Sequence, residues 1–292
     1  MVMSNHERTW LTERFEEQRS RLRAVAYRML GSLSEAEDAV QEAWLRLSGT
    51  DDGKVDNLNA WLTTVVARIS LNMLRSRKTR SETTMPEPIL DRVDGTSPEH
   101  ALLLANGVGL ALLIVLETLA PAERVAFVLH DIFDMAFEEI APIVDRTPEA
   151  ARQLASRARR RVQARDTTPD ANMEVQHSVV AAFLAAAHDG DFHRLVSVLD
   201  PDVVLRADAG ADRPGGEVHG AEKVARGASS FSHLGLLRRP VLVNGVAGAL
   251  CLLDGKPFAV MAFTVKGEKI IEIDILRDPD RLGRLDLTVL DR

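Results

Sequence analysis

The sequence predicts a multidomain protein: two all-α domains, the second containing a helix-turn-helix, followed by an α+β domain. Three observations support this fold class. Apolar residues recur at helical spacing through most of the first 165 residues, and a proline-rich stretch interrupts them once. After residue 173 the pattern changes to short apolar runs between glycine-containing turns, which is typical of β-strands. A chain of 292 residues with 46% hydrophobic residues is long enough for two or three such cores.

The first domain, residues 12–80, contains three amphipathic stretches. Leu22, Val25 and Met29 follow helical spacing, and Gly31 is expected to end this helix. Ser34 is expected to cap a second helix, which a polar loop at residues 49–56 then follows. The third helix is expected to start near Asn57–Asn59 and to bury the apolar residues Leu62, Val65, Val66, Ile69 and Met73.

Residues 81–98 contain three prolines and a glycine and are expected to form an extended linker. Helices are expected again in the second domain, residues 99–165. An apolar helix is expected to run to about Thr118, and another to begin at Pro121. A short helix at residues 137–144, a turn and a basic helix from Pro148 then form the helix-turn-helix pattern.

The third domain, residues 173–292, is expected to begin with an amphipathic helix at residues 175–188. A run of antiparallel strands is expected to follow, because turn-forming glycines separate short apolar segments. The expected strands are residues 203–207, 240–243, 249–253, 258–265 and 270–276.

Composition excludes several classes of protein. The single cysteine, Cys251, excludes a disulfide framework and a cysteine-rich zinc site, and we expect it to be a small buried hydrophobe. With 4% aromatic residues, an aromatic RNA-stacking surface is not expected. No apolar run approaches the roughly 20 residues of a membrane span, and residues 1–10 lack a signal-peptide pattern. We therefore expect a cytoplasmic protein.

The positive charges are concentrated, although the net charge is -7. Residues 57–81 and 150–165 contain no acid. Their basic residues are Arg68, Arg75, Arg77, Lys78 and Arg80 in the first stretch, and Arg152, Arg157, Arg159, Arg160, Arg161 and Arg165 in the second. Two basic helices on an acidic protein indicate two localised contacts with phosphates.

An acidic and polar helix face is expected in the first domain. Asp38, Gln41, Glu42 and Leu45 fall on one side of the second helix, with Trp44 near its edge. Such a face suits a basic helical partner, with the aromatic and leucine side chains as anchors. An ordinary solvated helix face is the alternative that spacing alone leaves open.

The stretch from Glu35 to Leu47 resembles the helix with which extracytoplasmic-function sigma factors bind the clamp of core RNA polymerase. The segment Ala60-Trp61-Leu62 through Arg77 resembles their promoter-melting and minus-ten-reading region. The stretch from Pro121 to Arg159 resembles their minus-thirty-five-binding domain. Together these segments cover roughly residues 16–165. The resemblance implies core RNA polymerase (the clamp of β′ and the flap of β) and promoter DNA as partners, with no cofactor, metal or membrane.

The resemblance also implies roles for individual residues. The first group would hold or unstack the non-template strand; it comprises Trp61, Thr64, Arg68, Asn72, Arg75 and Arg77. A buried structural tryptophan is an equal alternative for Trp61. In the second group Arg152 could pair with a guanine, and Gln153 and Ser156 could read base edges. The phosphate contacts would be Arg157, Arg159 and Arg160.

The linker and the third domain resemble the sigma-factor subgroup that carries a SnoaL-like domain, a cone-shaped relative of nuclear transport factor two. That subgroup has a Trp-Leu-Pro-Glu-Pro linker motif, in which Thr84-Met85 here replaces the aromatic residue. The expected regulatory residues are Pro86, Glu87 and Pro88 in the linker, Asp208 and Arg213 in one loop, and Asp278, Pro279, Asp280 and Arg281 in another. We expect the third domain to dock on the linker and to restrain the two DNA-binding domains in the free protein. The linker has spare acids, Glu87 and Asp91, and the loops that the resemblance marks as regulatory offer the basic residues Arg213 and Arg281.

Two other functions remain open from sequence. One is a helix-turn-helix regulator with a ligand-sensing domain, which leaves residues 35–47 and 61–77 unexplained. The other is a SnoaL-type enzyme fused to a DNA-binding domain, because some relatives of that domain are cyclases. Five of the eight histidines lie in the third domain, but their spacing fits no metal site: His177, His188, His193, His219 and His233. An enzyme is therefore not expected, whereas a small ligand in this domain stays open.

Overall fold

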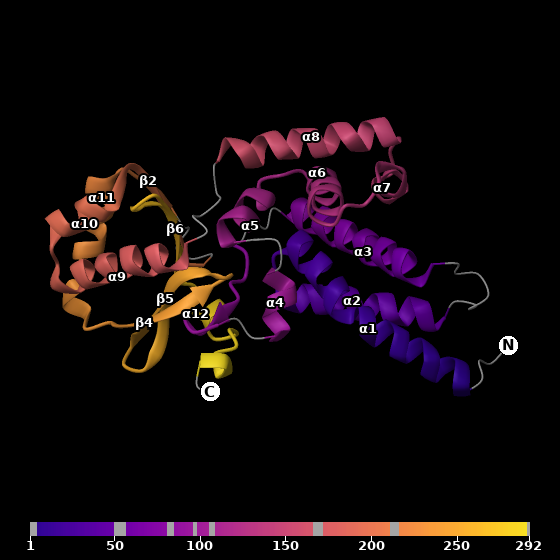
Figure 1. Cartoon of the computed structure of the whole chain (residues 1–292), viewed down its shortest axis with the longest axis horizontal. Helices are drawn as coiled ribbons and strands as arrows, with labels where there is room; N and C mark the ends of the chain where they lie inside the picture. The colour runs from indigo at the N-terminus through magenta and orange to yellow at the C-terminus, as the bar shows by residue number, and fades with distance from the viewer. Residues whose placement is uncertain are drawn as a thin grey trace. The chain divides into compact units, whose positions relative to one another are not determined.

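The structure is a computed structural model that describes residues 5–49, 57–80, 85–95, 98–104, 109–165, 172–210 and 216–290. The chain divides into two compact units (Figure 1). The helical unit comprises Met1–Glu87, Pro98–Asn106 and Leu113–Asp166. The sheet unit comprises Pro88–Ser97, Gly107–Leu112 and Thr167–Arg292.

The helical unit contains the helices predicted for the first two domains. They are α1 Asn5–Leu30, α2 Leu33–Ser48, α3 Leu58–Arg80, α4 Pro98–Leu104, α5 Leu110–Glu117 (from Leu113 on), α6 Pro121–Phe127, the π-helical turn η2 Val128–Ile132, α7 Phe137–Val144 and α8 Pro148–Ala164. The prediction of one apolar helix running to about Thr118 is wrong, because this stretch contains two separate helices, α4 and α5. None of the described helices is long and apolar enough to span a membrane.

The junction between α1 and α2 corrects one expected cap. Gly31 ends α1 as predicted: its φ is +67° and its N–H donates to Tyr27 O at 2.7 Å. Only glycine adopts this left-handed backbone freely. The N-cap of α2 is Ser32 and not Ser34, since Ser32 has the extended backbone of a cap and its Oγ accepts from Glu35 N.

The helix-turn-helix is confirmed in α7 and α8. Asp145 ends α7 in the left-handed conformation, at φ +57°. Two residues later Thr147 caps α8 by accepting from Ala150 N at 3.3 Å, and Pro148 occupies the first helical position. These local signals fix where the basic helix begins.

The sheet unit is an α+β fold. Its helical elements are α9 Met173–Asp189, α10 Phe192–Val198, α11 Ala221–Ser229, η3 Ser232–Leu234, α12 Pro279–Leu282 and η4 Thr288–Leu290. Its strands are β1 Leu90–Asp91, β2 Leu199–Asp208, β3 Glu217–His219, β4 Leu237–Val243, β5 Val246–Leu253, β6 Lys256–Lys266 and β7 Lys269–Leu276. The described strands form one sheet in the order β1-β4-β5-β6-β7-β2-β3.

The topology of this sheet corrects the expectation of antiparallel strands alone. β2 pairs with β7 in parallel, whereas the other described pairs are antiparallel. Register shifts in the pairs of β6 with β5 and with β7 mark bulges, which bend a sheet. The core lies between the sheet and the helices, where Phe183 of α9 meets Phe263 of β6 with ring centroids 5.3 Å apart.

Candidate functional site

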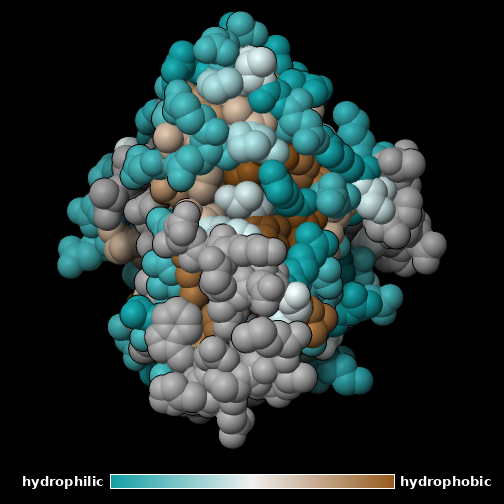
Figure 2. All heavy atoms as spheres, turned by 90° about the vertical axis from the view of Figure 1, so that its right-hand side faces the viewer, coloured by the Kyte–Doolittle hydropathy of each residue, from teal (hydrophilic) through white to brown (hydrophobic). Residues whose placement is uncertain are grey.

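The predicted acidic face of α2 is exposed in the helical unit. Asp38 and Gln41 are exposed, and Leu45 is 58% exposed, which is unusual for a large aliphatic side chain. Glu42 is half-buried and forms an ion pair with Arg46. The side of the molecule that Figure 2 shows has hydrophobic residues set among hydrophilic ones.

Trp44 lies at the edge of this face rather than fully on it. Its ring packs on Phe15 of α1, with centroids 4.9 Å apart, and the residue is half-buried. Asp38, Gln41 and Leu45 therefore form a free polar surface with one apolar anchor, which we call the α2 face.

The predicted nucleic-acid residues of α3 differ in accessibility. Trp61 and Thr64 are half-buried, and Asn72 is exposed. Arg68 donates to Pro142 O of α7 at 3.1 Å, and Arg75 lies 3.6 Å from Asp145 at the end of the same helix. Both arginines are exposed, and exposed ion pairs contribute only about 0–1 kcal/mol. A polyanion could therefore compete for them.

Arg77, one of the residues predicted to bind DNA, is held within the helical unit. Its guanidinium donates to Leu30 O at 2.7 Å and to Glu35 Oε1 at 3.1 Å. These bonds tie α3 to the end of α1 and the start of α2. Arg77 therefore stabilises the helical unit, and its contact with DNA stays a prediction.

Replacing Arg77 with methionine is expected to destabilise the helical unit by about 2 kcal/mol, because charge-assisted hydrogen bonds to a carbonyl and a carboxylate are lost. Chemical denaturation followed by circular dichroism measures this. Arg75→Met is the matched control on the same helix, and its exposed ion pair predicts a cost of about 0–1 kcal/mol. Equal losses in the two variants would contradict the assignment.

The basic helix α8 has one exposed face and one face paired within the unit. Arg152, Gln153 and Arg160 are exposed, and Ser156 is half-buried. The Arg152 guanidinium lies 5.2 Å from the centroid of the Phe137 ring, which holds it near the start of the helix. Arg160 has no ion pair with any residue in the described part of the chain.

The other arginines of α8 bind acids of the preceding elements. Arg157 donates to Glu123 Oε1 at 2.9 Å, and Arg161 lies 3.5 Å from the same carboxylate. Arg159 donates to Asp131 at 2.6 Å, and this hydrogen bond raises the pKa of Arg159. Arg157 and Arg159 stay predicted phosphate ligands, but each must first leave an internal partner to bind DNA.

Two family matches and several relatives agree with this geometry. Residues 15–80 match the family described as Sigma-70 region 2, and residues 110–162 match Sigma-70, region 4. The chain is 39% identical to the ECF RNA polymerase sigma factor SigJ of Mycobacterium tuberculosis, over 91% of this chain and 91% of the relative. The chain belongs to the extracytoplasmic-function (ECF) RNA polymerase sigma factors.

Further relatives extend this family assignment along the chain. A probable ECF sigma factor of M. tuberculosis, SigI, is 37% identical over 89% of this chain and 91% of its own length. The crystal structure of the M. tuberculosis ECF sigma factor SigJ has a TM-score of 0.75 and 35% identity, and the match covers 94% of this chain and 99% of that one. The similarity includes the appended sheet unit, so the SnoaL-like subgroup expected from sequence is confirmed.

The two loop motifs of the sheet unit lie together in this sigma factor. Arg281 forms an ion pair with Asp208 at 2.5 Å, and Arg277 N donates to Asp208 O at 2.6 Å. Asp278 caps α12 by accepting from Asp280 N, with Pro279 at the first helical position. Arg213 lies outside the described residues. Asp208 thus binds the guanidinium of Arg281, and the docking of this loop on the linker stays a prediction.

Successive residues of the linker form hydrogen bonds in the two units. In the helical unit, the Glu87 carboxylate accepts from Leu33 N at 2.9 Å, at the positive end of α2, and Tyr27 Oη donates to Glu87 O at 2.7 Å. Pro86 and Pro88 are buried, as is Asp91. Glu87 is therefore half-buried and binds the N-terminus of α2.

In the sheet unit, the next residues of the linker form β1 on the edge strand β4. Leu90 and Asp91 pair with Val243 and Leu242. Ile89 N donates to Asn244 Oδ1 at 3.1 Å, and Asn244 N donates to Ile89 O at 2.8 Å. The sequence signal at Asn244-Gly245 indicated a turn, but not that its amide side chain binds the linker.

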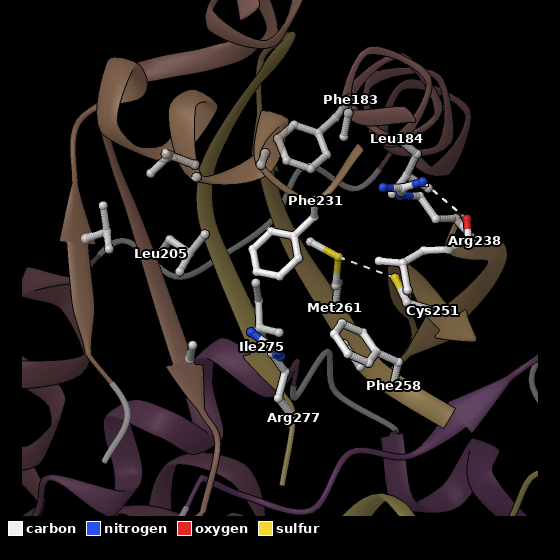
Figure 3. Close-up of a pocket in the computed structure, with 18 of the residues that line it drawn as sticks. Phe183, Leu184, Leu205, Phe231, Arg238, Cys251, Phe258, Met261, Ile275 and Arg277 are labelled. Carbon is white, nitrogen blue, oxygen red and sulfur yellow. Dashed lines mark hydrogen bonds between the residues drawn. The ribbon is translucent and has the colours of Figure 1, made fainter. Parts of the chain in front are cut away.

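The sheet unit also contains a cavity of about 260 Å³ that sequence reasoning did not identify (Figure 3). Most of its lining is apolar, and three basic side chains join it, Lys223, Arg238 and Arg277. Cys251 lines it as well; this residue is buried as predicted, and burial raises the pKa of its thiol. The only sequence signal was the alternation of side chains along β6 and β7.

Proposed function

We propose that this sigma factor directs core RNA polymerase to specific promoters and melts them, and that its sheet unit regulates it in cis. One observation supports the promoter-directing function. The chain has sigma region 2 followed by region 4, and each region has an exposed helix face, on α2 in the first and on α8 in the second. The α2 face would bind the clamp of β′, and the second region would contact the flap of β. Such a protein acts in the cytoplasm, where transcription takes place.

Promoter binding would require Arg68 and Arg75 to leave α7. Their contacts are exposed, so the cost is about 0–1 kcal/mol for each. Contacts with phosphates of the non-template strand could offset this cost, because each neutralised phosphate also releases counterions. Trp61 and Thr64 at the start of α3 would then lie next to the opened strand.

In vitro transcription with purified core RNA polymerase tests this function. The chain is expected to bind core enzyme in size-exclusion chromatography and to yield defined start sites from a genomic DNA library. Binding to DNA without binding to core enzyme would favour the alternative of a helix-turn-helix regulator with a ligand-sensing domain.

A binding role for the sheet unit is favoured over catalysis. Acid–base chemistry of the SnoaL type needs a carboxylate or an imidazole that reaches the substrate. The residues described around the cavity include neither. We therefore propose that this unit senses or docks and that the chain has no chemistry of its own.

Regulation in cis is supported by how the linker is held. Glu87 caps α2, the helix that carries the proposed clamp-binding face, and Ile89 is hydrogen-bonded to Asn244 two residues along the chain. A two-residue edge strand such as β1, paired with β4, can open and close. Release of β1 would free the chain next to the cap of α2, and polymerase binding could favour that released state.

Asn244→Gly is expected to loosen the linker about fivefold, since one hydrogen bond contributes about 1 kcal/mol. Glycine tolerates the left-handed backbone of this turn, where φ is +50°, so the β4–β5 hairpin should persist. Hydrogen exchange at the Ile89 amide should become faster, and transcription with core enzyme should increase.

The matched control is Asp254→Gly. Asp254 occupies the same position in the β5–β6 turn, also at φ +50° and before a glycine. It is expected to leave the Ile89 amide and transcription unchanged. Faster exchange without any change in transcription would contradict the regulatory part of the proposal while leaving the sigma function in place.

A further inference from the structure

The π-helical turn η2 lies between α6 and α7, and the basic helix α8 packs against both of these helices (Figure 1). Turns of this kind are rare in proteins and are frequent at functional sites. Through separate contacts, two consecutive residues of this turn, His130 and Asp131, connect it to two arginines of α8.

His130 is half-buried and has two contacts with residues at the start of α7. Its Nδ1 donates to Met135 O at 3.0 Å, since a carbonyl oxygen can only accept. Its ring stacks on that of Phe137, the first residue of α7, with centroids 3.9 Å apart and planes inclined by 32°. The hydrogen bond holds the imidazole in the turn, and the stack restricts the orientation of the Phe137 ring.

The Phe137 ring is also the surface against which Arg152 lies. Phe137 is 9% exposed, and the Arg152 guanidinium lies 5.2 Å from the centroid of its ring, within the range of a cation–π contact. Arg152 is exposed and has no ion pair with any residue that the structure describes. A ring in a fixed position can therefore orient this arginine. A long side chain that is ordered before binding loses less entropy when it pairs with a base.

We propose that His130 is a positioning residue for promoter reading. It fixes the Phe137 ring, and this ring orients Arg152 toward the base pair that Arg152 reads. The inference rests on the proposed function, because it assumes that α8 enters the major groove and that Arg152 pairs with a base. His130 itself does not contact DNA.

Asp131 gives the same turn a second connection to α8. Its carboxylate accepts from Arg159 at 2.6 Å. Arg159 lies two helical turns after Arg152 and is a predicted phosphate ligand. The two neighbouring residues of the turn thus act on different parts of promoter binding, His130 on base reading and Asp131 on phosphate binding.

Anisotropy of the holoenzyme on a promoter panel measures the effect of His130. The base pair that Arg152 reads is identified as the one at which Arg152→Ala loses discrimination. His130→Leu is expected to lower discrimination at that base pair, and at no other, by about three- to tenfold, the range expected for one aromatic contact. His130→Phe keeps a ring against Phe137 and is expected to stay within about twofold of the native chain.

The double variant His130→Leu, Arg152→Ala tests whether His130 acts through Arg152. Residues that act as one unit are not additive, so the double variant is expected to bind the preferred promoter as weakly as Arg152→Ala alone. A merely structural role would add a further loss and would affect every promoter position alike. That result, or full discrimination by a folded His130→Leu chain, would overturn the proposal.

Asp131→Asn is the matched control, because it changes the neighbouring residue of the same turn. It releases Arg159 and is expected to increase the slope of log affinity against log salt, while discrimination at the Arg152 base pair stays within about twofold. A loss of discrimination as large as that of His130→Leu would mean that any change in the turn disturbs α8, and the proposal would be wrong.

Proton NMR of the native free chain gives a readout that does not depend on the folding of a variant. Protons above an aromatic ring are shifted upfield, so the side-chain protons of Arg152 are expected upfield of those of Arg160, an exposed arginine of the same helix. Equal shifts of the two arginines would overturn the proposal.

The same experiments separate this inference from the proposed function. Failure of the native chain to bind core enzyme would contradict the proposed function. If Arg152→Ala changed no promoter position, the assignment of Arg152 to base reading and the role of His130 would both be wrong. Loss of discrimination in Arg152→Ala but not in His130→Leu would contradict the role of His130 alone.

Discussion

The double substitution Asp38→Arg, Gln41→Ala is expected to weaken binding to core RNA polymerase by about 30-fold or more, which is the effect of removing an interface hot spot of about 2 kcal/mol. Both side chains are exposed, and in the described structure neither has a hydrogen bond that its loss would break. The free energy of unfolding should therefore change by less than about 0.5 kcal/mol. Fluorescence anisotropy with labelled chain and core enzyme measures the affinity.

Leu45 adds a second way to probe the same face. It is 58% exposed, one helical turn beyond Gln41, so burying it against a partner would gain about 1.5–3 kcal/mol. Leu45→Ser should thus weaken core binding and, because the side chain packs little in the free chain, spare stability.

The matched control for the charge reversal is Glu13→Arg, an exposed acid on α1 of the same unit. It makes the same change in net charge and is expected to leave core affinity within about twofold. Weakening of equal size in Glu13→Arg and in the α2 variants would mean that total charge, and not the α2 face, determines binding. Unchanged affinity of the folded double variant would remove the α2 face from the interface.

The α2 face was predictable because its signals are local. Helical spacing assigns Asp38, Gln41 and Leu45 to one side, and burial follows from the apolar residues between them. The same holds for the helix-turn-helix, where Thr147 and Pro148 mark the start of α8. Which residues three or four apart share a helix face can be predicted without knowing how the rest of the chain folds.

The arginines show where sequence reasoning ends. A basic run does not tell which of its members are neutralised by distant acids. Arg77, Arg157 and Arg159 find theirs 42, 34 and 28 residues away, at Glu35, Glu123 and Asp131. Only the packing of the helices brings these groups together, so the internal partners of three predicted DNA contacts could not be foreseen.

Strand β1 was missed for a related reason. It is two residues long and has no alternating pattern of its own. Its register comes from Asn244, which is 155 residues from Ile89. When pairing with another strand, and not the segment's own side chains, determines a strand, the sequence of that segment shows no alternating pattern. The parallel pairing of β2 with β7 is equally nonlocal.

Arg152→Ala is expected to cost about 1–3 kcal/mol in promoter binding and to relax specificity at one base pair upstream, because a bidentate contact with a guanine is lost. The residue lies in the second turn of α8, where a recognition helix reaches base edges. Its contact with the Phe137 ring orients the guanidinium before binding, so Phe137→Leu should also weaken promoter binding, by a smaller amount. Anisotropy of the holoenzyme on a panel of promoters, with each upstream position varied in turn, measures both effects.

Arg160→Ala is the matched comparison, since it removes the same side chain from the same helix. Arg160 is exposed and has no ion pair among the described residues, so it is free to meet a phosphate. Its loss is expected to weaken binding to every promoter alike and to lower the slope of log affinity against log salt by about one. Arg159→Ala should have a smaller effect on that slope, because in the free chain Arg159 is bound to Asp131. If Arg152→Ala and Arg160→Ala gave the same pattern across the promoter panel and the same salt slope, α8 would not divide its arginines between bases and backbone, and the assignment of Arg152 to base reading would be wrong.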